Sequence, residues 1–343
     1  MGSNKTQNNR NSLNVAVCLV TYNQEKYIKQ AIDSVLKQKT TFPVDIIVGN
    51  DASVDGTADM VQSVVNQCVS PIGGGKIIVF NREKNMGIVG NTIDIFRYIF
   101  AHDYTYVAML DGDDWWCDEN KLQMQVDLME KNADVSFCYM NGTSDKNLAL
   151  NQKTTNRTCI KDMFNEIRST GIANGTILHR VSMLRQIPLD KIEKQNLLSM
   201  DYPTNVYMAR QGKVAFIDSI SLYWRRTGNT TSSAASKEKA YRYIDHEVRQ
   251  GLFLASEFPN TSYDFSKQEA EKFRCWQMYM WSYYQKDYES IVEAMSYDNF
   301  PRNWLNSRSE KNFLKNKMTF YTYVYFIKKI YTVLNILKRK INT

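Results

Sequence analysis

The sequence predicts an α/β fold, an open and mostly parallel sheet flanked by helices. Four short apolar runs, each typical of a buried strand, alternate with segments in which apolar residues recur at helical spacing. Polar residues follow three of these runs directly, and ligands bind such sheets at the carboxyl ends of the strands. At 343 residues the chain is long enough for one large domain or for a domain with an extension.

The predicted strands of the first half are continuous apolar runs, which favour central positions in a parallel sheet. They lie at residues 15–20, 44–48, 77–80 and 105–110. Helices are predicted after them, at residues 28–36, 61–65, 85–100 and from Leu122 onward. The triplet Gly73-Gly74-Gly75 precedes a strand instead of linking a strand to a helix. It therefore predicts a surface turn and not a phosphate-binding loop.

The chain after residue 130 is less regular. Strands are predicted at residues 135–140, 177–179, 214–217 and 220–224, with a helix at 199–209. From Ser236 onward the pattern is helical and rich in aromatic residues.

An acidic loop, Asp111-Gly112-Asp113-Asp114, joins the fourth predicted strand to the next helix. Carboxylates this close repel one another unless a cation or hydrogen-bond donors share them. Oxygen ligands suit Mg²⁺ or Mn²⁺ better than zinc, and the six Cys and three His of the chain show no zinc-ligand spacing. A solvated acidic turn is the alternative interpretation. Thr21 and Asp51, which are predicted at the same edge of the sheet, favour a site.

Several motifs, taken in their order, resemble family-2 inverting glycosyltransferases with the GT-A fold. In the first half they are Thr21-Tyr22-Asn23, residues 50–57, Asn85-Met86-Gly87 and residues 110–114. In the second half they are residues 200–203, 212–218 and 223–225. The resemblance covers residues 13–235 and implies a nucleotide-binding half, 13–142, and an acceptor half, 143–235. Residues 1–12 are then expected to be a disordered N-terminus, and 236–343 a helical, basic C-terminal extension.

The resemblance implies a site for a nucleotide-sugar donor, above all a UDP-sugar. The implied donor-binding residues are Thr21, Tyr22, Asn23, Asp51, Asp55, Asp111, Gly112 and Arg225. In this set Thr21 and Asp51 would contact uracil and ribose, Asp55 would support their loop, and Asp111 would bind ribose. Arg225 would contact the diphosphate, with Arg226 beside it.

The resemblance also implies that Asp113 ligates a Mn²⁺ or Mg²⁺ ion bridging the diphosphate, and that Asp201 is the catalytic base. Asp201 could instead cap the helix that it opens, and Ser199 is an equal candidate for that cap. The chain departs from the family at Asn50, where Asp is common, and at Thr227, where His is common. The second departure leaves the metal with fewer protein ligands.

Three aromatic or basic features have weaker interpretations. Trp115 and Trp116 could form a wall against the sugar, with one of the pair in the core. Arg82 and Lys84 are further candidates for diphosphate contact, although solvated surface charge is the favoured interpretation for both.

The net charge of the chain is +7, and this excess of positive charge comes from the C-terminal segment. Residues 301–343 hold ten Lys or Arg and one acid, and apolar residues recur at helical spacing from Phe320 to Leu337. This pattern predicts a basic amphipathic helix on an anionic membrane surface. A helix docked on the domain or on a second subunit is the alternative. Nucleic acid is not an expected partner, because no nucleic-acid-binding module accompanies the charge.

The sequence thus predicts a metal-dependent inverting glycosyltransferase that acts on a glycan or lipid-linked acceptor. We expect a cytoplasmic protein, peripheral on the inner face of the cell membrane, since residues 1–12 lack the apolar core of a signal peptide. One alternative is a nucleotidyltransferase of related fold, which usually needs a Gly-rich basic loop where this chain has residues 21–24. The other is a non-catalytic sugar- or membrane-binding protein.

Overall fold

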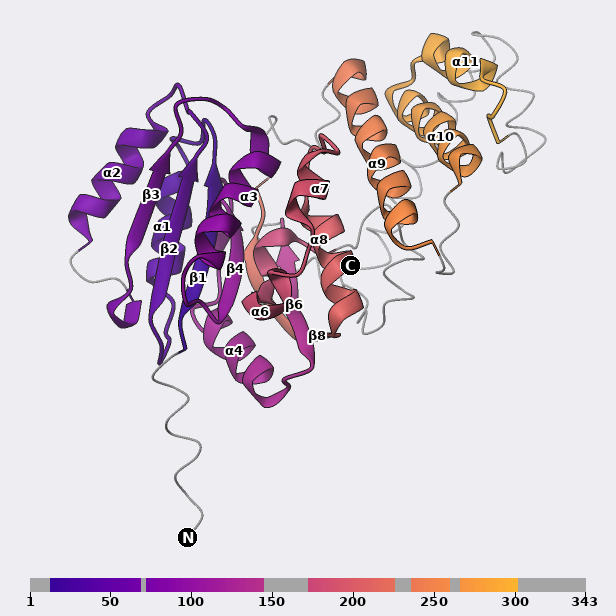
Figure 1. Ribbon diagram of the computed structural model, residues 1–343. Helices are drawn as coiled ribbons and strands as arrows, with labels where there is room; N and C mark the ends of the chain where they lie inside the picture. Colours follow the sequence, from indigo (N-terminus) through magenta and orange to yellow (C-terminus); the bar gives the residue numbers. More distant parts are fainter. Residues whose placement is uncertain (1–12, 69–71, 145–171, 226–235, 260–265, 302–343) are drawn as a thin grey trace, which may run out of the picture. The chain divides into compact units, whose positions relative to one another are not determined.

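The computed structural model describes residues 13–68, 72–144, 172–225, 236–259 and 266–301 (Figure 1). The chain divides into two compact units, residues 1–230 and 231–343, which we call the sheet unit and the helical unit. The sequence-based boundary, between residues 235 and 236, is close to this division. The N-terminus predicted to be disordered and the basic amphipathic helix predicted after Phe320 lie outside the described residues.

Eight strands form one sheet, in the order β3-β2-β1-β4-β7-β6-β8-β5. Their bounds are β1 Val15–Thr21, β2 Val44–Asn50, β3 Ile77–Asn81, β4 Tyr106–Asp111, β5 Trp115–Trp116, β6 Val135–Thr143, β7 Leu178–Arg180 and β8 Lys213–Tyr223. Strands β3, β2, β1 and β4 are parallel neighbours, whereas β7 runs antiparallel to β4 and β6, and β5 antiparallel to β8. The predicted α/β fold is confirmed, and the parallel half of the sheet is the half that the continuous apolar runs predicted.

Helices flank this sheet (Figure 1). Their bounds are α1 Ile28–Leu36, α2 Thr57–Gln67, α3 Gly87–Phe100, α4 Lys121–Lys131, α6 Val181–Leu184, α7 Leu189–Glu193 and α8 Asp201–Gln211. Two short 3₁₀ turns, η2 Ile72–Gly74 and η3 Asn174–Thr176, precede β3 and β7 respectively. Gly73 has a φ of 60°, which glycine adopts at low cost, so the predicted turn before β3 is confirmed.

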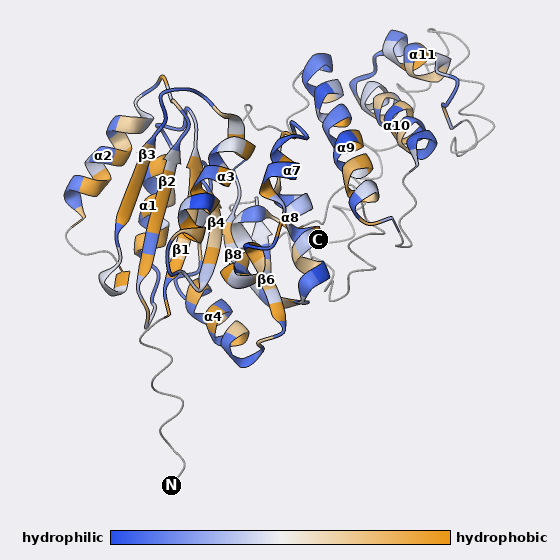
Figure 2. Cartoon of the chain, in the orientation of Figure 1, coloured by the Kyte–Doolittle hydropathy of each residue, from blue (hydrophilic) through white to orange (hydrophobic). Residues whose placement is uncertain are grey.

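The core of the sheet unit is formed by the parallel strands and the apolar faces of α1, α2 and α4. Every residue of β1 is buried, which agrees with its unbroken apolar run. In Figure 2 the most hydrophobic segments of this unit are its strands. Burying one Val, Leu or Ile side chain is worth about 1.5–3 kcal/mol, so this central layer fixes where the carboxyl ends of β1, β2 and β4 lie.

Strand β8 corrects the prediction of two strands at 214–217 and 220–224. It is one strand of 11 residues, and its register against β6 shifts at Asn141. The side chain of Asn141 donates to Asp218 Oδ1 at 2.8 Å, in the stretch of β8 that the shift leaves without a direct partner. A bulge of this kind places polar residues inside a strand. In the sequence pattern these polar residues look like a loop between two strands, so one strand was predicted as two.

The helical unit comprises α9 Lys237–Glu257, α10 Lys267–Gln285 and α11 Tyr288–Ser296. Each begins after a side chain that accepts a hydrogen bond from its first turn, Ser236, Ser266 and Asp287 respectively. Its core is apolar and aromatic and includes Ile244, Tyr279 and Ile291. Among the helices in the described ranges, none is both long and apolar enough to cross a membrane.

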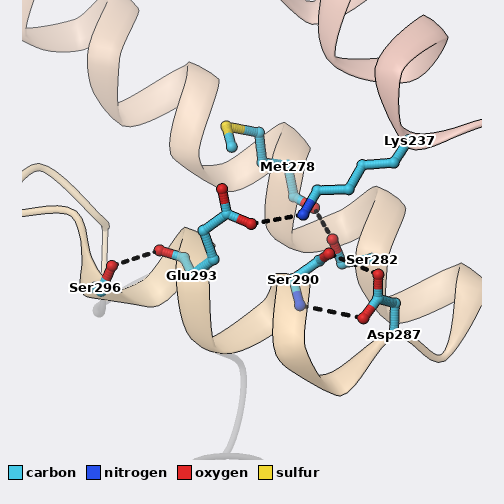
Figure 3. Close-up of polar contacts among 7 residues, drawn as sticks. All are labelled: Lys237, Met278, Ser282, Asp287, Ser290, Glu293 and Ser296. Atoms are coloured by element: carbon cyan, nitrogen blue, oxygen red, sulfur yellow. Dashed lines mark hydrogen bonds and ion pairs between the residues drawn. The ribbon is translucent and has the colours of Figure 1, made fainter.

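Figure 3 shows how α9 and α11 are joined in this unit. Lys237, the first residue of α9, forms an ion pair of 2.6 Å with Glu293 of α11. On α11, Asp287 accepts hydrogen bonds from the backbone and the hydroxyl of Ser290. On α10, the Ser282 hydroxyl donates to the carbonyl of Met278. The polar contacts drawn here are thus side-chain caps, local backbone bonds and one surface ion pair.

Candidate active site

The loops after β1 and β2 are tied together by side-chain hydrogen bonds. Asn23 has a left-handed φ of 52°, its backbone N–H donates to Ser53 Oγ at 2.9 Å, and its Oδ1 accepts from the Val54 N–H at 2.9 Å. Thr21 Oγ1 donates to Gln24 Oε1 at 2.8 Å. Tyr22 between them is 46% exposed, so its ring is available to a ligand.

Asp51 lies at the carboxyl end of β2 and is 3% exposed. Its Oδ1 accepts the Met86 N–H at 2.7 Å, and the neighbouring Gly87 N–H, at the start of α3, donates to Asn85 Oδ1 at 3.0 Å. Burial raises the pKa of Asp51, while these two amides act in the opposite direction. The carboxyl is therefore anchored to α3, and the Asn85 side chain secures the same loop by donating to the Asp51 carbonyl at 3.1 Å.

Asp55 joins the same two loops from the solvent side. Its carboxylate accepts hydrogen bonds from the Thr57 backbone and hydroxyl and from the Glu25 N–H. Burial alone would raise the pKa of Asp55, but these donors outweigh it and the pKa is lowered. These are the contacts of a residue that holds a loop.

Three carboxylates interact at the acidic loop. Asp111 and Asp113 belong to the loop, and Asp201 comes from a distant part of the chain. Burial, followed by the negative charges of Asp113 and Asp201, raises the pKa of Asp111 to about 7. Asp111 Oδ1 is buried and has no hydrogen-bond partner among the described residues, while the Asn174 side chain acts to lower the pKa of this carboxyl group. A buried carboxylate oxygen without a donor is costly, so the protein favours the protonated form of Asp111.

Gly112 is required by close packing against the loop after β1. A Cβ at this position would lie 2.5 Å from Gln24 Oε1 and 2.8 Å from Thr21 Oγ1. The Gly112 N–H donates to the Val20 carbonyl at 2.9 Å. The acidic loop and the loop after β1 therefore form one surface, and Gln24, which sequence reasoning did not assign, is part of it.

The Arg225 side chain holds the acidic loop through hydrogen bonds. Its Nε donates to the Asp113 carbonyl at 2.9 Å, and its Nη2 donates to Gln30 Oε1 at 2.8 Å. The guanidinium lies over the rings of Tyr27 and Trp115, at 4.4 and 4.8 Å from their centroids. The hydrogen bonds of this side chain thus go to the protein, and the diphosphate contact implied for Arg225 stays a prediction.

Asp114 is the third carboxylate of the loop and also escaped assignment from the sequence. Its Oδ1 accepts the Arg225 backbone N–H at 2.7 Å. Burial raises its pKa to about 8, with the charge of Asp111 as the next cause. Asp114 therefore links the acidic loop to the end of β8.

Asp201 is the first residue of α8, and Met200 occupies the N-cap position. The alternative interpretation of Asp201 or Ser199 as the cap is therefore wrong. A carboxylate in the first turn interacts favourably with the helix dipole. Together with its influence on Asp111, this position leaves Asp201 at the edge of the acidic cluster.

The metal role implied for Asp113 stays a prediction. Across the described ranges, no group of three or more His, Cys, Asp and Glu side chains could hold a metal ion. The negative charges of Asp113 and Asp201 act together on Asp111, and carboxylate oxygens are the ligand type that Mn²⁺ and Mg²⁺ prefer. Thr227, where the family often has His, lies outside the described residues.

The remaining candidates have clear positions. Arg82 is not a solvated surface charge, because it pairs with Asp94 at 2.6 Å and its side chain is only 15% exposed. Lys84 is exposed, as expected. Trp116 is the member of its pair that packs in the core, and Trp115 stacks on Tyr223 at 4.0 Å.

Comparison with protein-family models gives a match to glycosyl transferase family 2 over residues 16–193. Escherichia coli WfgD, a UDP-Glc:alpha-D-GlcNAc-diphosphoundecaprenol beta-1,3-glucosyltransferase, is 32% identical over 127 residues, which cover 37% of this chain and 45% of that protein. An uncharacterized Mycobacterium tuberculosis protein is 31% identical over 128 residues, 36% of this chain and 34% of its own length. The chain therefore spans less than half the length of these curated relatives.

Solved structures show the same fold. S. aureus TarS residues 1–349 in complex with UDP-GlcNAc superpose with a TM-score of 0.50 at 15% identity, covering 82% of this chain and 79% of that one. The Pyrobaculum calidifontis mannosyltransferase PcManGT, in complex with GDP-Man and Mn²⁺, gives 0.51 at 13% identity, covering 82% and 73%. The GT-A fold implied by the motifs is confirmed.

Proposed function

The chain belongs to glycosyl transferase family 2, and from that premise we propose that it is a metal-dependent inverting glycosyltransferase that uses a UDP-sugar. The observation that carries this proposal is the acidic cluster. Asp111 and Asp113 come from the predicted donor half and Asp201 from the predicted acceptor half, yet the charges of Asp113 and Asp201 both act on Asp111. A transferase needs this juxtaposition, because the donor diphosphate and the acceptor hydroxyl must meet at one carbon.

In the proposed reaction the acceptor hydroxyl attacks the anomeric carbon, the bond from that carbon to the diphosphate oxygen breaks, and UDP leaves. The hydroxyl proton passes to the Asp201 carboxylate, a step worth about 10²–10⁴-fold in rate for a well-placed base. A Mn²⁺ or Mg²⁺ ion held by Asp113 would stabilise the charge that grows on the departing diphosphate. Attack from the face opposite the leaving group inverts the configuration at the sugar, by analogy with glycoside hydrolysis.

The binding roles follow from the positions of the loops. Tyr22 offers an exposed ring to the base, and Asp51 is held by the start of α3 at the neighbouring strand end. Asp111, the last residue of β4, would accept a ribose hydroxyl at its carboxyl group. Thr21, Asn23, Asp55 and Gly112 would then shape the donor site by holding the three loops together.

Two relatives support the donor class and one supports the acceptor class. WfgD uses UDP-Glc and a diphosphoundecaprenol acceptor, and the TarS complex contains UDP-GlcNAc. We extend these properties to this chain as a UDP-sugar donor and a glycan or lipid-linked acceptor. A lipid-linked acceptor would suit a cytoplasmic enzyme that sits on the inner face of the cell membrane through its basic segment, residues 302–343.

A thermal-shift panel of UDP, GDP, CDP and dTDP, each with and without Mn²⁺, tests the proposal. A ligand that binds only the folded state increases the free energy of unfolding by mass action, by about 2.7 kcal/mol at one hundred times its Kd. The melting temperature rises as a result. We expect the largest shift with UDP, and we expect Mn²⁺ to increase it. Asp113→Asn should remove the Mn²⁺-dependent part and leave the melting temperature without ligand nearly unchanged.

Two results would count against the proposal. A metal-independent shift would remove Asp113 from the metal role. No shift with any nucleotide would favour the non-catalytic interpretation of the fold.

A further inference from the structure

Gln24 lies between β1 and α1, and its side chain packs on the acidic loop. A Cβ on Gly112 would lie 2.5 Å from Gln24 Oε1, so the amide group rests against the backbone that joins Asp111 to Asp113. Gly112 is buried, whereas Gln24 is only half-buried. We propose that Gln24 is a donor-binding residue, whose amide Nε2 donates a hydrogen bond to the phosphate attached to the ribose. This inference rests on the proposed function for the identity of the ligand.

The backbone of Gln24 is held on both sides. Its N–H donates at 2.8 Å to the hydroxyl of Thr57, the first residue of α2. Its carbonyl accepts the N–H groups of Tyr27 and Ile28, at the start of α1, at 2.9 and 3.0 Å. Thr57 and Ile28 are fully buried, so these contacts belong to the interior of the sheet unit. The fold therefore fixes the point from which the Gln24 side chain extends.

The hydroxyl of Thr21 orients the amide group. Thr21 is 3% exposed, and its hydroxyl donates to Gln24 Oε1 at 2.8 Å. The oxygen and the nitrogen of an amide branch from one carbon in different directions. Nε2 is therefore directed away from Thr21 while Oε1 is bound to it. A group that is oriented before binding loses less conformational freedom when a ligand arrives.

The amide nitrogen remains available to a ligand. Within the described part of the chain, the hydrogen bonds of Gln24 use its N–H, its carbonyl and Oε1, and none uses Nε2. Nε2 is not a buried atom, so a ligand can reach it. An amide nitrogen donates and does not accept, so its partner must offer an acceptor such as a phosphate oxygen.

The position of Gln24 selects one group of the nucleotide-sugar. In the proposed function Asp111 binds the ribose and Asp113 holds the metal ion at the diphosphate, and Gly112 lies between these two residues in the chain. The phosphate attached to the ribose bridges the same two parts of the ligand, so it meets the side chain that covers Gly112. A hydrogen bond to a charged oxygen is stronger than one between neutral groups. A neutral amide provides this bond without forming an ion pair with the neighbouring carboxylates.

Titrations of the full chain with uridine, UMP and UDP, each with Mn²⁺, test this inference. Gln24→Met keeps the length of the side chain and removes its hydrogen-bonding groups. We expect the Kd values of UMP and UDP to rise about tenfold, the loss of one hydrogen bond to a charged group, and that of uridine to stay within about twofold. Gln62→Met is the matched control, because Gln62 Nε2 donates to Asn66 Oδ1 at 2.9 Å on α2, outside the acidic loop. Its three Kd values should equal those of the wild-type chain.

Gln24→Glu decides the test if Gln24→Met melts at a lower temperature than the wild-type chain. This variant keeps an acceptor for the Thr21 hydroxyl and replaces the donor with a carboxylate. UMP and UDP should then bind more weakly by about tenfold or more, and the Kd of uridine should again stay within about twofold. Unchanged binding of UMP by this variant would overturn the inference.

The titrations distinguish failure of the inference from failure of the proposed function. If the wild-type chain binds UDP and Gln24→Met binds UMP and UDP equally well, the inference alone is overturned. Equal weakening of uridine, UMP and UDP also overturns it, because Gln24 would then act through the structure of the loop. Weakening of UDP alone would assign the contact to the second phosphate, against the proposal. A wild-type chain that binds none of the three ligands contradicts the proposed function, and the inference fails with it.

Discussion

The sheet unit and the helical unit place their acidic and basic side chains differently. In the described part of the sheet unit Asp51 and Lys121 are at most 3% exposed, whereas no Asp, Glu, Lys or Arg is buried in the described part of the helical unit. In that of the helical unit the ion pairs are at the surface, and in the Lys237–Glu293 pair both side chains are more than 40% exposed. Buried charge costs stability unless partners compensate it. The sheet unit also bears that cost in the acidic loop, where burial raises the pKa of Asp111 and Asp114, and perturbed groups of this kind gather at sites of chemistry.

The largest predicted effect is that of Asp201→Asn on the rate of sugar transfer by the sheet unit. The side chain keeps its size and its place in the first turn of α8, but it can no longer accept a proton. We expect sugar transfer to fall by about 10²–10⁴-fold, with UDP affinity and melting temperature nearly unchanged. The measurement is the initial rate of transfer at saturating donor.

Asp190→Asn is the matched control for this variant. Asp190 also lies in the first turn of a helix, α7, but its side chain is 80% exposed and pairs with Arg97. Its rate should equal that of the wild-type chain. A fully active Asp201→Asn would show that another group, or water, takes the proton.

The next effect concerns pH, because each unit contains one buried histidine. Burial lowers the pKa of His179 to about 4, and it lowers that of His246 similarly, with the charge of Arg249 as a second cause. The ordinary value is near 6.5, so between pH 6.5 and 4 the unfolded chain takes up a proton that the folded chain does not. Stability is therefore full above pH 6.5 and falls as the pH drops toward 4, by up to roughly 3 kcal/mol for His179.

His179→Gln and His246→Gln locate this loss in the two units. Hydrogen exchange of the full chain, followed by mass spectrometry, reports on β7 and α8 separately from α9. We expect His179→Gln to flatten the pH dependence of the sheet unit only, and His246→Gln that of the helical unit only. A pH dependence that neither variant changes would assign the loss to carboxyl groups.

A smaller effect is expected from Arg225→Ala, which tests whether the stability of the acidic loop depends on its contacts with the Arg225 side chain. The variant loses the hydrogen bonds to the Asp113 carbonyl and Gln30, and the contacts with Tyr27 and Trp115. The free energy of unfolding should fall by about 1–3 kcal/mol, and Mn²⁺-dependent UDP binding should weaken with it. Arg225→Lys keeps the charge but not the planar fork, so it should recover little of either. Full recovery by Lys would instead indicate that charge alone matters, as in contact with a diphosphate.

The sequence predicted the parallel half of the fold because its strands are buried on both faces. Unbroken apolar runs such as 15–20 and 44–48 indicate strands that are covered on both faces of the sheet, and in the structure both runs form buried strands. Strand β8 was predicted as two pieces, because Asp218 and Ser219 belong to an irregular stretch whose polarity resembles a loop. Local pattern fails where a strand departs from regular pairing.

The candidate site was predictable where a motif carries its own chemistry. Asp111, Asp113 and Asp201 were assigned through the resemblance of their motifs to a known family, and in the structure the charges of Asp113 and Asp201 act on Asp111. Gln24 and Asp114 were not assigned, because their partners, Thr21 and Arg225, matter only after the loops have come together.

The smallest effect should come from Lys237→Ala in the helical unit. The variant removes the ion pair with Glu293, drawn in Figure 3, and also the contact of the ammonium group with the Tyr241 ring, at 5.3 Å from its centroid. Because both charges of the pair are exposed and screened by salt, the free energy of unfolding should change by only about 0–1 kcal/mol. Denaturation in low and high salt checks this, and the wild-type advantage should shrink further in high salt. A loss as large as that of Arg225→Ala, and insensitive to salt, would show that the helical unit also depends on a desolvated charge, and the contrast between the two units would no longer hold.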